Sequence, residues 1–185
     1  MIDEFRSCIL LLIFASILGC NYSTSNDESL LKNYDLNGAD NTIIYLPNAL
    51  KEVSGIAYFD ESHLLTHNDE KGIVYKINIT SGKVIAEFSI GKKEIEKDFE
   101  GIALVDDSVY LVASNGTIFK FTLSGNISDR EYEKIITPLS SENDVEGLCY
   151  DEKANSLLLA CKGETERKDK NYKAVYEFSL IEMKF

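Results

Sequence analysis

Two glutamates hold equivalent places in this chain, 46 residues apart, and both are candidates for binding a cation. Each stands immediately before a glycine in a similar stretch of sequence. An asparagine and an aspartate, side by side elsewhere in the chain, offer further oxygen atoms. Calcium takes about 6–8 oxygen ligands, supplied mainly by carboxylates and amide or backbone carbonyls. The candidate calcium ligands are therefore Glu100, Glu146, Asp69 and, through its amide oxygen, Asn68.

Other polar residues are candidates for a wider binding face around these ligands. His67 directly precedes Asn68-Asp69, so it is a better candidate for a base than His63, which lies at a turn. No serine stands in a G-x-S-x-G sequence, and no Ser-His-Asp set is visible. Catalysis is therefore not indicated by any complete set of residues. The candidate binding face comprises Glu52, Ser54, His67, Asn115 and Lys162.

The elements that must position these residues follow from an internal repeat. The three copies are Glu52–Tyr58, Asp98–Leu104 and Asp144–Tyr150, and both intervals are 46 residues. Each copy reads acid, apolar, Ser or Glu, Gly, apolar, small, apolar. Turn residues and further short apolar runs follow each copy in the same order, and such runs bounded by Gly, Asp and Ser are typical of strands.

Four short antiparallel strands in about 40–50 residues make one blade of a β-propeller. The sequence therefore predicts an all-β fold with about three blades, over residues 52–97, 98–143 and 144–185, in a domain spanning 41–185. Propellers have about 4–8 blades, so three blades form an incomplete ring. We interpret Thr42–Leu46 as a closing strand and expect the chain to be a fragment or to complete its ring with another chain.

The propeller register gathers the candidate residues on one face. Loops that enter each innermost strand lie at the same end of the blade as the loops between the second and third strands. Glu100 and Glu146 then both point toward the central channel, with Ser54 in the equivalent place of the first blade. The alternative is structural, since each glutamate can instead bind backbone N–H groups of the neighbouring blade and lock it in place.

The N-terminus resembles a bacterial lipoprotein signal. Residues 8–19 form an apolar run too short to span a bilayer, which needs about 20 residues, but suitable for a signal core. Ile17-Leu18-Gly19-Cys20 resembles a lipobox. We therefore expect a signal peptide at 1–19, a lipid on Cys20, a polar tether at 20–40 and attachment to the plasma or outer membrane of a bacterial envelope. A plain cleaved signal or a buried helix is the alternative.

The net charge limits the classes of partner that the chain can bind. The net charge of −12 opposes binding to phosphate backbones, so we expect no nucleic-acid partner.

Cys149 aligns with Ala57 and Ala103, which predicts that it fills a small position in the core. In the predicted hairpin Cys149 should lie opposite Leu158 rather than Cys161. The spacing of the Cys and His residues fits no zinc site. A disulfide between Cys149 and Cys161 is the alternative.

The stretch from about Leu46 to Leu180 resembles the SdiA-regulated (YjiK/CarP-like) β-propeller family. The resemblance rests on SGIAY and HNDEKG in the first blade and on the steps DFEGIAL and DVEGLCYD. It implies an envelope propeller related in fold to phytase-like propellers, with one branch of the family linked to calcium responses. This chain is shorter than the family pattern.

The leading hypothesis is a membrane-anchored binding or sensing module for an unknown small-molecule or protein ligand, with calcium as its candidate cofactor. The first alternative is a calcium-dependent phytase-like phosphatase or lactonase-type hydrolase, for which the candidate face offers few basic groups besides Lys162 and nearby Arg167. The second is a nonfunctional truncated remnant. Open blade edges also predict self-association.

Overall fold

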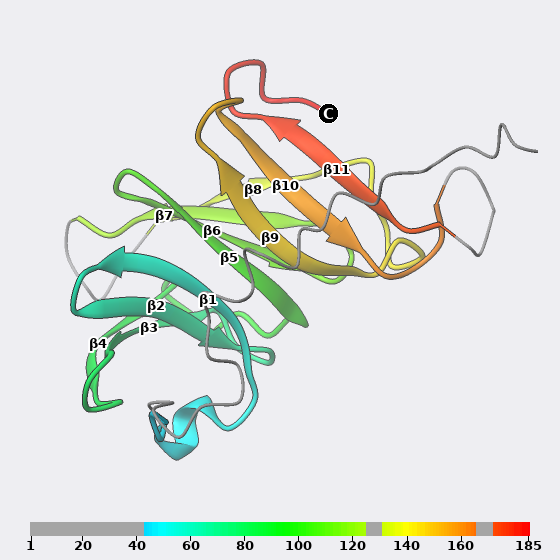
Figure 1. Ribbon diagram of the computed structural model, residues 1–185. Coiled ribbons are helices and arrows are strands. Elements are labelled where there is room, and N and C mark those ends of the chain that lie inside the picture. Colours follow the sequence, from blue (N-terminus) through cyan, green and yellow to red (C-terminus); the bar gives the residue numbers. More distant parts are fainter. Residues whose placement is uncertain (1–42, 125–130, 166–171) are drawn as a thin grey trace, which may run out of the picture. The chain divides into compact units, whose positions relative to one another are not determined.

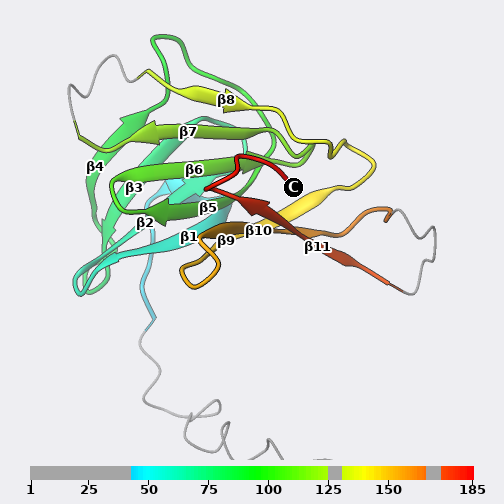
Figure 2. The same cartoon turned by 90° about the horizontal axis from the view of Figure 1, so that it is seen from above.

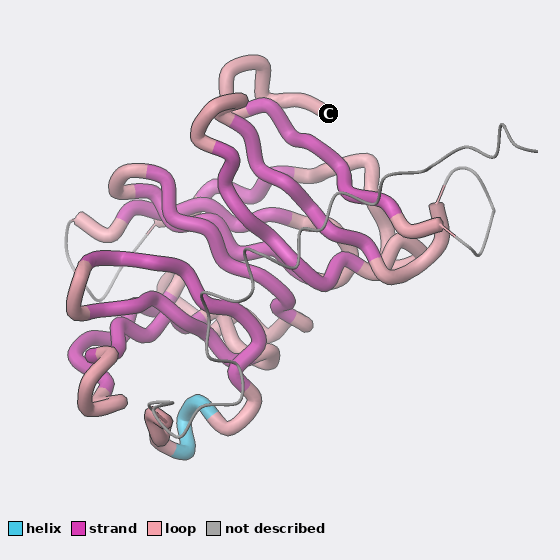
Figure 3. The backbone as a smooth tube through the Cα atoms, in the orientation of Figure 1, coloured by secondary structure: helices cyan, strands magenta, loops and turns pink. Residues whose placement is uncertain are grey.

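The computed structural model describes residues 43–124, 131–165 and 172–185. The expected signal peptide, the lipid on Cys20 and the tether lie outside these ranges. Within them the chain forms three antiparallel sheets, and the only helix is a single short turn (Figure 3). No helix in the described ranges is long and apolar enough to cross a membrane. These three sheets are the three propeller blades that the repeat predicts. The described residues do not close a ring.

Blade one is a four-stranded meander in which each strand pairs with the next along the chain. Its first strand carries the first copy of the repeat, and because successive side chains of a strand point to opposite faces, its apolar run Ile56–Phe59 supplies apolar side chains to both faces of the sheet. The elements are the short helix η1 (Asn48–Leu50) and the strands β1 (Val53–Asp60), β2 (His63–Asn68), β3 (Ile73–Asn78) and β4 (Val84–Ser89).

Blade two repeats this topology, and its inner strand carries the second copy of the repeat. Its second strand is buried on both faces, because blade two has a neighbouring sheet on each side. Figure 1 shows this sheet between the other two. Its strands are β5 (Phe99–Val105), β6 (Ser108–Ala113), β7 (Ile118–Thr122) and β8 (Glu133–Ile135).

Blade three has three strands in the described part of the chain. After its last strand the chain turns back, and Ser179 pairs with Lys184 in an isolated bridge. The ring of Phe185 then packs at 5.2 Å from that of Phe178, centroid to centroid. The strands are β9 (Val145–Asp151), β10 (Ser156–Cys161) and β11 (Ala174–Ser179).

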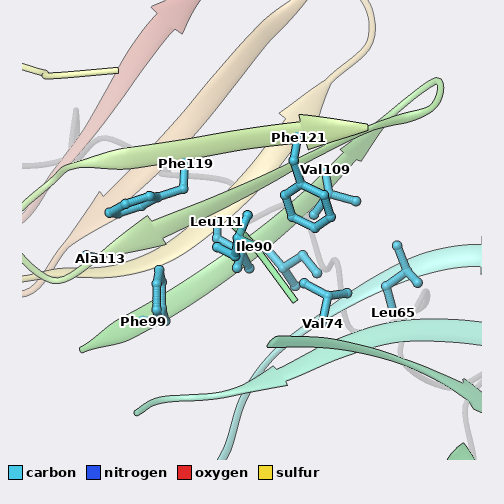
Figure 4. Close-up of a cluster of buried hydrophobic side chains, with 10 residues drawn as sticks. Leu65, Val74, Ile90, Phe99, Val109, Leu111, Ala113, Phe119 and Phe121 are labelled. Atoms are coloured by element: carbon cyan, nitrogen blue, oxygen red, sulfur yellow. The ribbon is translucent and has the colours of Figure 1, made fainter. Parts of the chain in front are cut away.

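The first strands of the blades pack against one another, β1 on β5 and β5 on β9, which identifies them as the innermost strands (Figure 2). We call the side of a blade that looks toward the next blade in sequence its forward face, and the opposite side its rear face. The forward face of blade one and the rear face of blade two enclose a core that includes Leu65, Val74, Phe99 and Leu111 (Figure 4). A second core, which includes Val112 from blade two, joins blades two and three.

The segment before η1 corrects one expectation. We expected Thr42–Leu46 to be a closing strand, but residues 43–46 form no strand. The backbone of Tyr45 instead lies against the turn at Gly82, where a Cβ atom would come within 2.2 Å of the Tyr45 carbonyl oxygen. Leu46 and Leu50 pack on blade one. A β-strand needs an adjacent strand with which its backbone can form hydrogen bonds, and residues 43–46 have none among the described residues.

Cys149 gives a second correction. It pairs with Leu158 as the hairpin register predicts, and neither Cys149 nor Cys161 forms a disulfide. Ala103 fills the equivalent place in blade two and is buried, but Cys149 is exposed. Both lie on forward faces, and only that of blade two is covered by another blade. The expected core position therefore depends on a neighbour that blade three does not have in this structure.

Candidate functional site

A backbone ladder lies along the end of the blades where the innermost strands begin. In blade one, the amide of Asp69 donates to the carbonyl of Glu52 (3.2 Å), and the Asp69 carbonyl accepts from the amide of Phe99 in blade two (2.7 Å). Ser114 makes the same two bonds: its amide donates to the carbonyl of Asp98, and its carbonyl accepts from the amide of Val145, each at 2.8 Å. The loops after each second strand therefore share one end with the entries to the innermost strands, where the sequence placed the candidate face.

Ser54 and Glu100 meet across the boundary between blades one and two. The Ser54 hydroxyl donates to Glu100 Oε2 at 2.9 Å. The two residues occupy the same place in successive copies of the repeat, immediately before the glycine. Glu100 therefore contacts the preceding blade, which is close to the structural alternative considered for it, although the donor is a hydroxyl rather than a backbone amide.

The electrostatic surroundings of Glu100 are acidic. Burial raises the pKa of its carboxyl above the ordinary value of 4.5, and the nearby charges of Asp98 and Glu146 raise it further. The hydrogen bond from Ser54 acts in the opposite direction, because it stabilises the charged form. Glu100 and Glu146 are thus close enough to repel each other, as expected of two carboxylates on the same end of adjacent innermost strands.

Glu146 differs from Glu100 because it has a basic partner. Lys162 Nζ lies 2.6 Å from Glu146 Oε1 and 3.5 Å from Asp144 Oδ2. All three side chains are exposed to solvent by a third or more, so the pairing adds little to stability. It does neutralise much of the negative charge at the start of β9. Lys162 belongs to the predicted binding face, and in the structure it forms an ion pair with Glu146, a predicted metal ligand.

Asp69 lies in the loop after β2 and has an unusual environment. Its Oδ1 atom is buried and has no hydrogen-bond partner among the described residues. The residue lines a cavity of about 440 Å³ between that loop and the segment that leads into β5. Burial of an unpaired carboxylate oxygen is costly, so such an atom calls for a ligand, a water molecule or a proton. The cavity is lined by Asp69, Glu70, Lys71, Glu96, Lys97 and Asp98.

Asn68, Asn115 and Glu52 take peripheral places. The amide oxygen of Asn68 accepts a hydrogen bond from the backbone of Lys71 (3.1 Å), so it supports the loop. Asn115 does the same for Thr117 (3.1 Å) at an exposed turn. Glu52 is exposed at the entry to β1. Asn68 is therefore engaged within its own loop rather than directed at the carboxylates.

His67 is not on the binding face, which corrects its predicted placement. It is fully buried on the forward face of β2 and stacks edge-on to Phe99, with ring centroids 6.5 Å apart. Its Nδ1 lies 2.8 Å from the carbonyl of Asn68, whereas Nε2 has no partner. A Cβ atom on Gly55 would come within 2.5 Å of Nε2. The strand alternation that buries Leu65 also buries His67.

The four predicted metal ligands are not assembled into one site. Within the described ranges, no group of three or more His, Cys, Asp or Glu side chains is arranged to hold a metal ion. Asp98 was not among the predicted site residues, although it lines the cavity beside Asp69 and raises the pKa of Glu100. The signal was available in the sequence, since an acidic residue opens each copy of the repeat.

Comparison with solved structures supports the fold. The hydrazine synthase of Kuenenia stuttgartiensis matches over 82% of this chain and 37% of that chain, at 13% identity and a TM-score of 0.50. The glutaminyl cyclase of Myxococcus xanthus matches 71% of this chain and 52% of its own, at 17% identity and a TM-score of 0.43. A PQQ-bound aldose sugar dehydrogenase from Streptomyces coelicolor matches 68% and 42%, at 15% identity and 0.42. The chain thus spans little more than a third of the hydrazine synthase chain, and only that match, at a TM-score of 0.50, bears on the fold, and on the fold alone.

Comparison with protein families is more specific. A search of curated protein sequences finds no match. The model of the SdiA-regulated family matches residues 29–181, which includes all three copies of the 46-residue repeat and nearly all of the three blades. The chain therefore belongs to the SdiA-regulated family of β-propeller proteins.

Proposed function

We propose that this chain is a non-catalytic binding module that recognises a cation, with calcium the first ion to test, at the end of the blades where the innermost strands begin. The observation that carries the proposal is the group Asp69, Asp98 and Glu100, whose carboxylates form no ion pair with another described residue. Asp69 has a buried oxygen without a hydrogen-bond partner among the described residues, and Glu100 has a raised pKa because it is partly buried and has acidic neighbours. A cation at this end would relieve both.

The oxygen chemistry suits calcium, but the geometry requires movement. Carboxylate oxygens are the ligands that calcium prefers. Because Asp69, Asp98 and Glu100 do not converge on one point, binding would require their side chains to close on the ion. Lys162 already neutralises Glu146, so we place the ion nearer blades one and two than blade three.

A binding role rather than a catalytic one follows from the position of the histidine. His67 is the most credible base in the sequence, yet its unpartnered nitrogen faces the glycine and the apolar side chains between two blades. A base in that place cannot take a proton from a substrate on the surface. The polar residues that do reach the surface are suited to hold a ligand.

Isothermal titration of calcium chloride into the full chain tests the cation. We expect saturable binding that Glu100→Gln weakens by about tenfold, which corresponds to about 1.4 kcal/mol. The matched control is Glu61→Gln, at the β1–β2 turn, at the opposite end of the innermost strand, which should leave the affinity unchanged. Absence of both heat and a thermal shift at millimolar calcium would contradict the proposal.

Attachment to the bacterial envelope is a separate part of the proposal and rests on the sequence at Cys20. A lipid there would hold the blades at a membrane surface, beyond a polar tether. Metabolic labelling with a clickable fatty acid tests it. The label should appear on the wild-type chain and be lost in Cys20→Ala, while Cys149→Ala retains it; label that persists in Cys20→Ala would rule the anchor out.

A further inference from the structure

The two outer faces of the three-blade array are apolar, and no other blade among the described residues covers them. On the forward face of blade three, Val175 is 65% exposed. On the rear face of blade one, Ile56 and Tyr58 of the innermost strand are 59% and 66% exposed. Figure 1 shows these sheets at opposite ends of the array, with β5–β8 between them. Both faces therefore present side chains of the kind that the blades bury elsewhere.

The forward faces of the blades are equivalent, residue by residue. The strand registers align Val74, Ile118 and Val175, each on the third strand of its blade. Val74 and Ile118 are fully buried because the next blade covers them. Val175 has the same chemistry and the same position without that cover. The forward face of blade three is thus built like the two that receive a blade.

The rear face of blade one is built like the surfaces that dock there. Ile56 aligns with Ile102 and Leu148, which belong to the cores between the blades. The sequence Ile56-Ala57-Tyr58 closely matches Leu148-Cys149-Tyr150 in blade three. The open rear surface of β1 therefore carries the residues that the open forward face of blade three would be expected to receive.

The backbone ladder described above stops at equivalent residues of blade three and blade one, where the carbonyl and the amide that would continue it bond no other blade among the described residues. Inside the array, the carbonyls of Asp69 and Ser114 accept from the first residue of the next innermost strand. Lys162 is their equivalent in blade three, and its carbonyl accepts from the side chain of Lys173 instead. Val53 is the equivalent of the donors Phe99 and Val145. It is 39% exposed, whereas both of those are fully buried.

The segment around η1 covers only part of the rear face of blade one. Leu50 packs on Tyr75 and Ile77 of β3, which are buried. It leaves the innermost strand free. Inside the array, β5 packs on β1 and β2, and β9 packs on β5 and β6, so the innermost strand makes most of each contact between blades. The cap at η1 is therefore compatible with a further blade contact through β1.

From these equivalences we infer that a second copy of this chain docks head to tail, with its β1 on β9 and β10 of the first copy. Its Val53 amide then bonds the Lys162 carbonyl in place of Lys173. Such an interface joins different surfaces of the two copies, and it ends in a closed assembly only if the rotation closes. Two copies would form a six-bladed ring, within the range of about 4–8 blades that propellers adopt.

Gly147→Ala is the decisive variant. A Cβ atom at Gly147 would meet only Ala160, at an ordinary 3.5 Å, so the chain should fold normally. At the equivalent Gly101, a Cβ atom would come within 2.7 Å of the backbone of Leu148 in the next blade. The added methyl should therefore block the docking copy at Ile56. In native mass spectrometry of the full chain from a mild detergent, we expect a wild-type dimer and a Gly147→Ala monomer.

Mixing two further variants establishes the direction of docking. Ile56→Asp and Val175→Asp should each be monomeric, and a mixture of the two should form a heterodimer, because one intact pair of faces remains. Ile136→Asp is the control, since this exposed residue follows β8 and lies on neither open face. Alkylation mapped by peptide mass spectrometry should modify Cys149 in Gly147→Ala and spare it in the wild type.

Three results would overturn the inference. A wild-type chain that stays monomeric at high micromolar concentration has no such interface. An Ile56→Asp variant that remains dimeric points to a symmetric contact between two forward faces instead. A Gly147→Ala variant that folds and still dimerises shows that the docked copy does not approach as the blades do.

Discussion

The Ser54 hydroxyl lies 2.9 Å from Glu100 Oε2 and joins the innermost strands of two successive blades at equivalent places in the repeat. This bond holds a predicted metal ligand, Glu100, whose pKa is raised, and it opposes that rise. Stability and charge at the candidate site are therefore linked through a single hydroxyl.

Ser54→Ala should destabilise the fold, because Glu100 would lose the hydrogen bond from the Ser54 hydroxyl and keep only the contacts with its acidic neighbours. A hydrogen bond to a charged group contributes about 1.5–3 kcal/mol, and partial exposure here reduces the expected loss to about 1 kcal/mol. The pKa of Glu100 should also move further up. Chemical denaturation and an NMR titration of the Glu100 side chain measure the two effects. Ser124→Ala, at an exposed turn, is the control and should change neither.

Glu100→Gln should stabilise the fold at neutral pH in the absence of a cation. A carboxyl whose pKa is raised on folding takes up protons as the chain folds, so its charged form opposes folding above that pKa. The advantage of the variant should shrink as pH falls through the raised pKa and vanish below 4.5, the ordinary value, where the wild-type carboxyl becomes protonated in both states. Thermal unfolding across this pH range measures the difference, and an advantage that does not change with pH would contradict the assignment.

The repeat glycines should differ sharply in their tolerance of a methyl group. Gly101→Ala should cost about 1–3 kcal/mol, because the new Cβ would overlap the backbone of Leu148. Gly147→Ala should cost less than about 0.5 kcal/mol, as for a surface change. Urea unfolding followed by tyrosine fluorescence measures both, in dilute solution so that association does not contribute. Equal costs would mean that blades two and three do not pack as described.

Acidification should destabilise the fold through His67. Burial lowers the pKa of His67 below its ordinary value of 6.5, while the Asn68 carbonyl and the charge of Asp69 act weakly in the opposite direction. The stability due to neutral His67 is therefore present at neutral pH and is lost as pH falls below 6.5, where the unfolded chain takes up the proton.

Melting temperatures measured between neutral and mildly acidic pH test this. His67→Gln should abolish that part of the loss. His63→Gln changes the only other histidine, half-buried at the β1–β2 turn, and should retain it. If His63→Gln rather than His67→Gln removes the pH dependence, the assignment is wrong.

The sequence by itself determined the strands of the three blades, their order and, at the hairpin of Cys149, their register. The 46-residue repeat predicts three blades with Glu100 and Glu146 in equivalent places, and it pairs Cys149 with Leu158, as observed. These are local properties, because alternation along a strand and turn residues between strands depend on residues near in sequence. The repeat also placed the candidate residues at one end of the blades.

Only the tertiary structure decided what each side chain meets. The same alternation that buries Ala103 leaves Cys149 exposed, because burial depends on the blade opposite. Whether His67 reaches the surface, whether Glu146 stands free or is paired with Lys162, and whether an oxygen of Asp69 is enclosed all depend on contacts between segments distant in sequence. The repeat describes each blade as if its neighbours were identical, and the chemistry of this face arises where they differ.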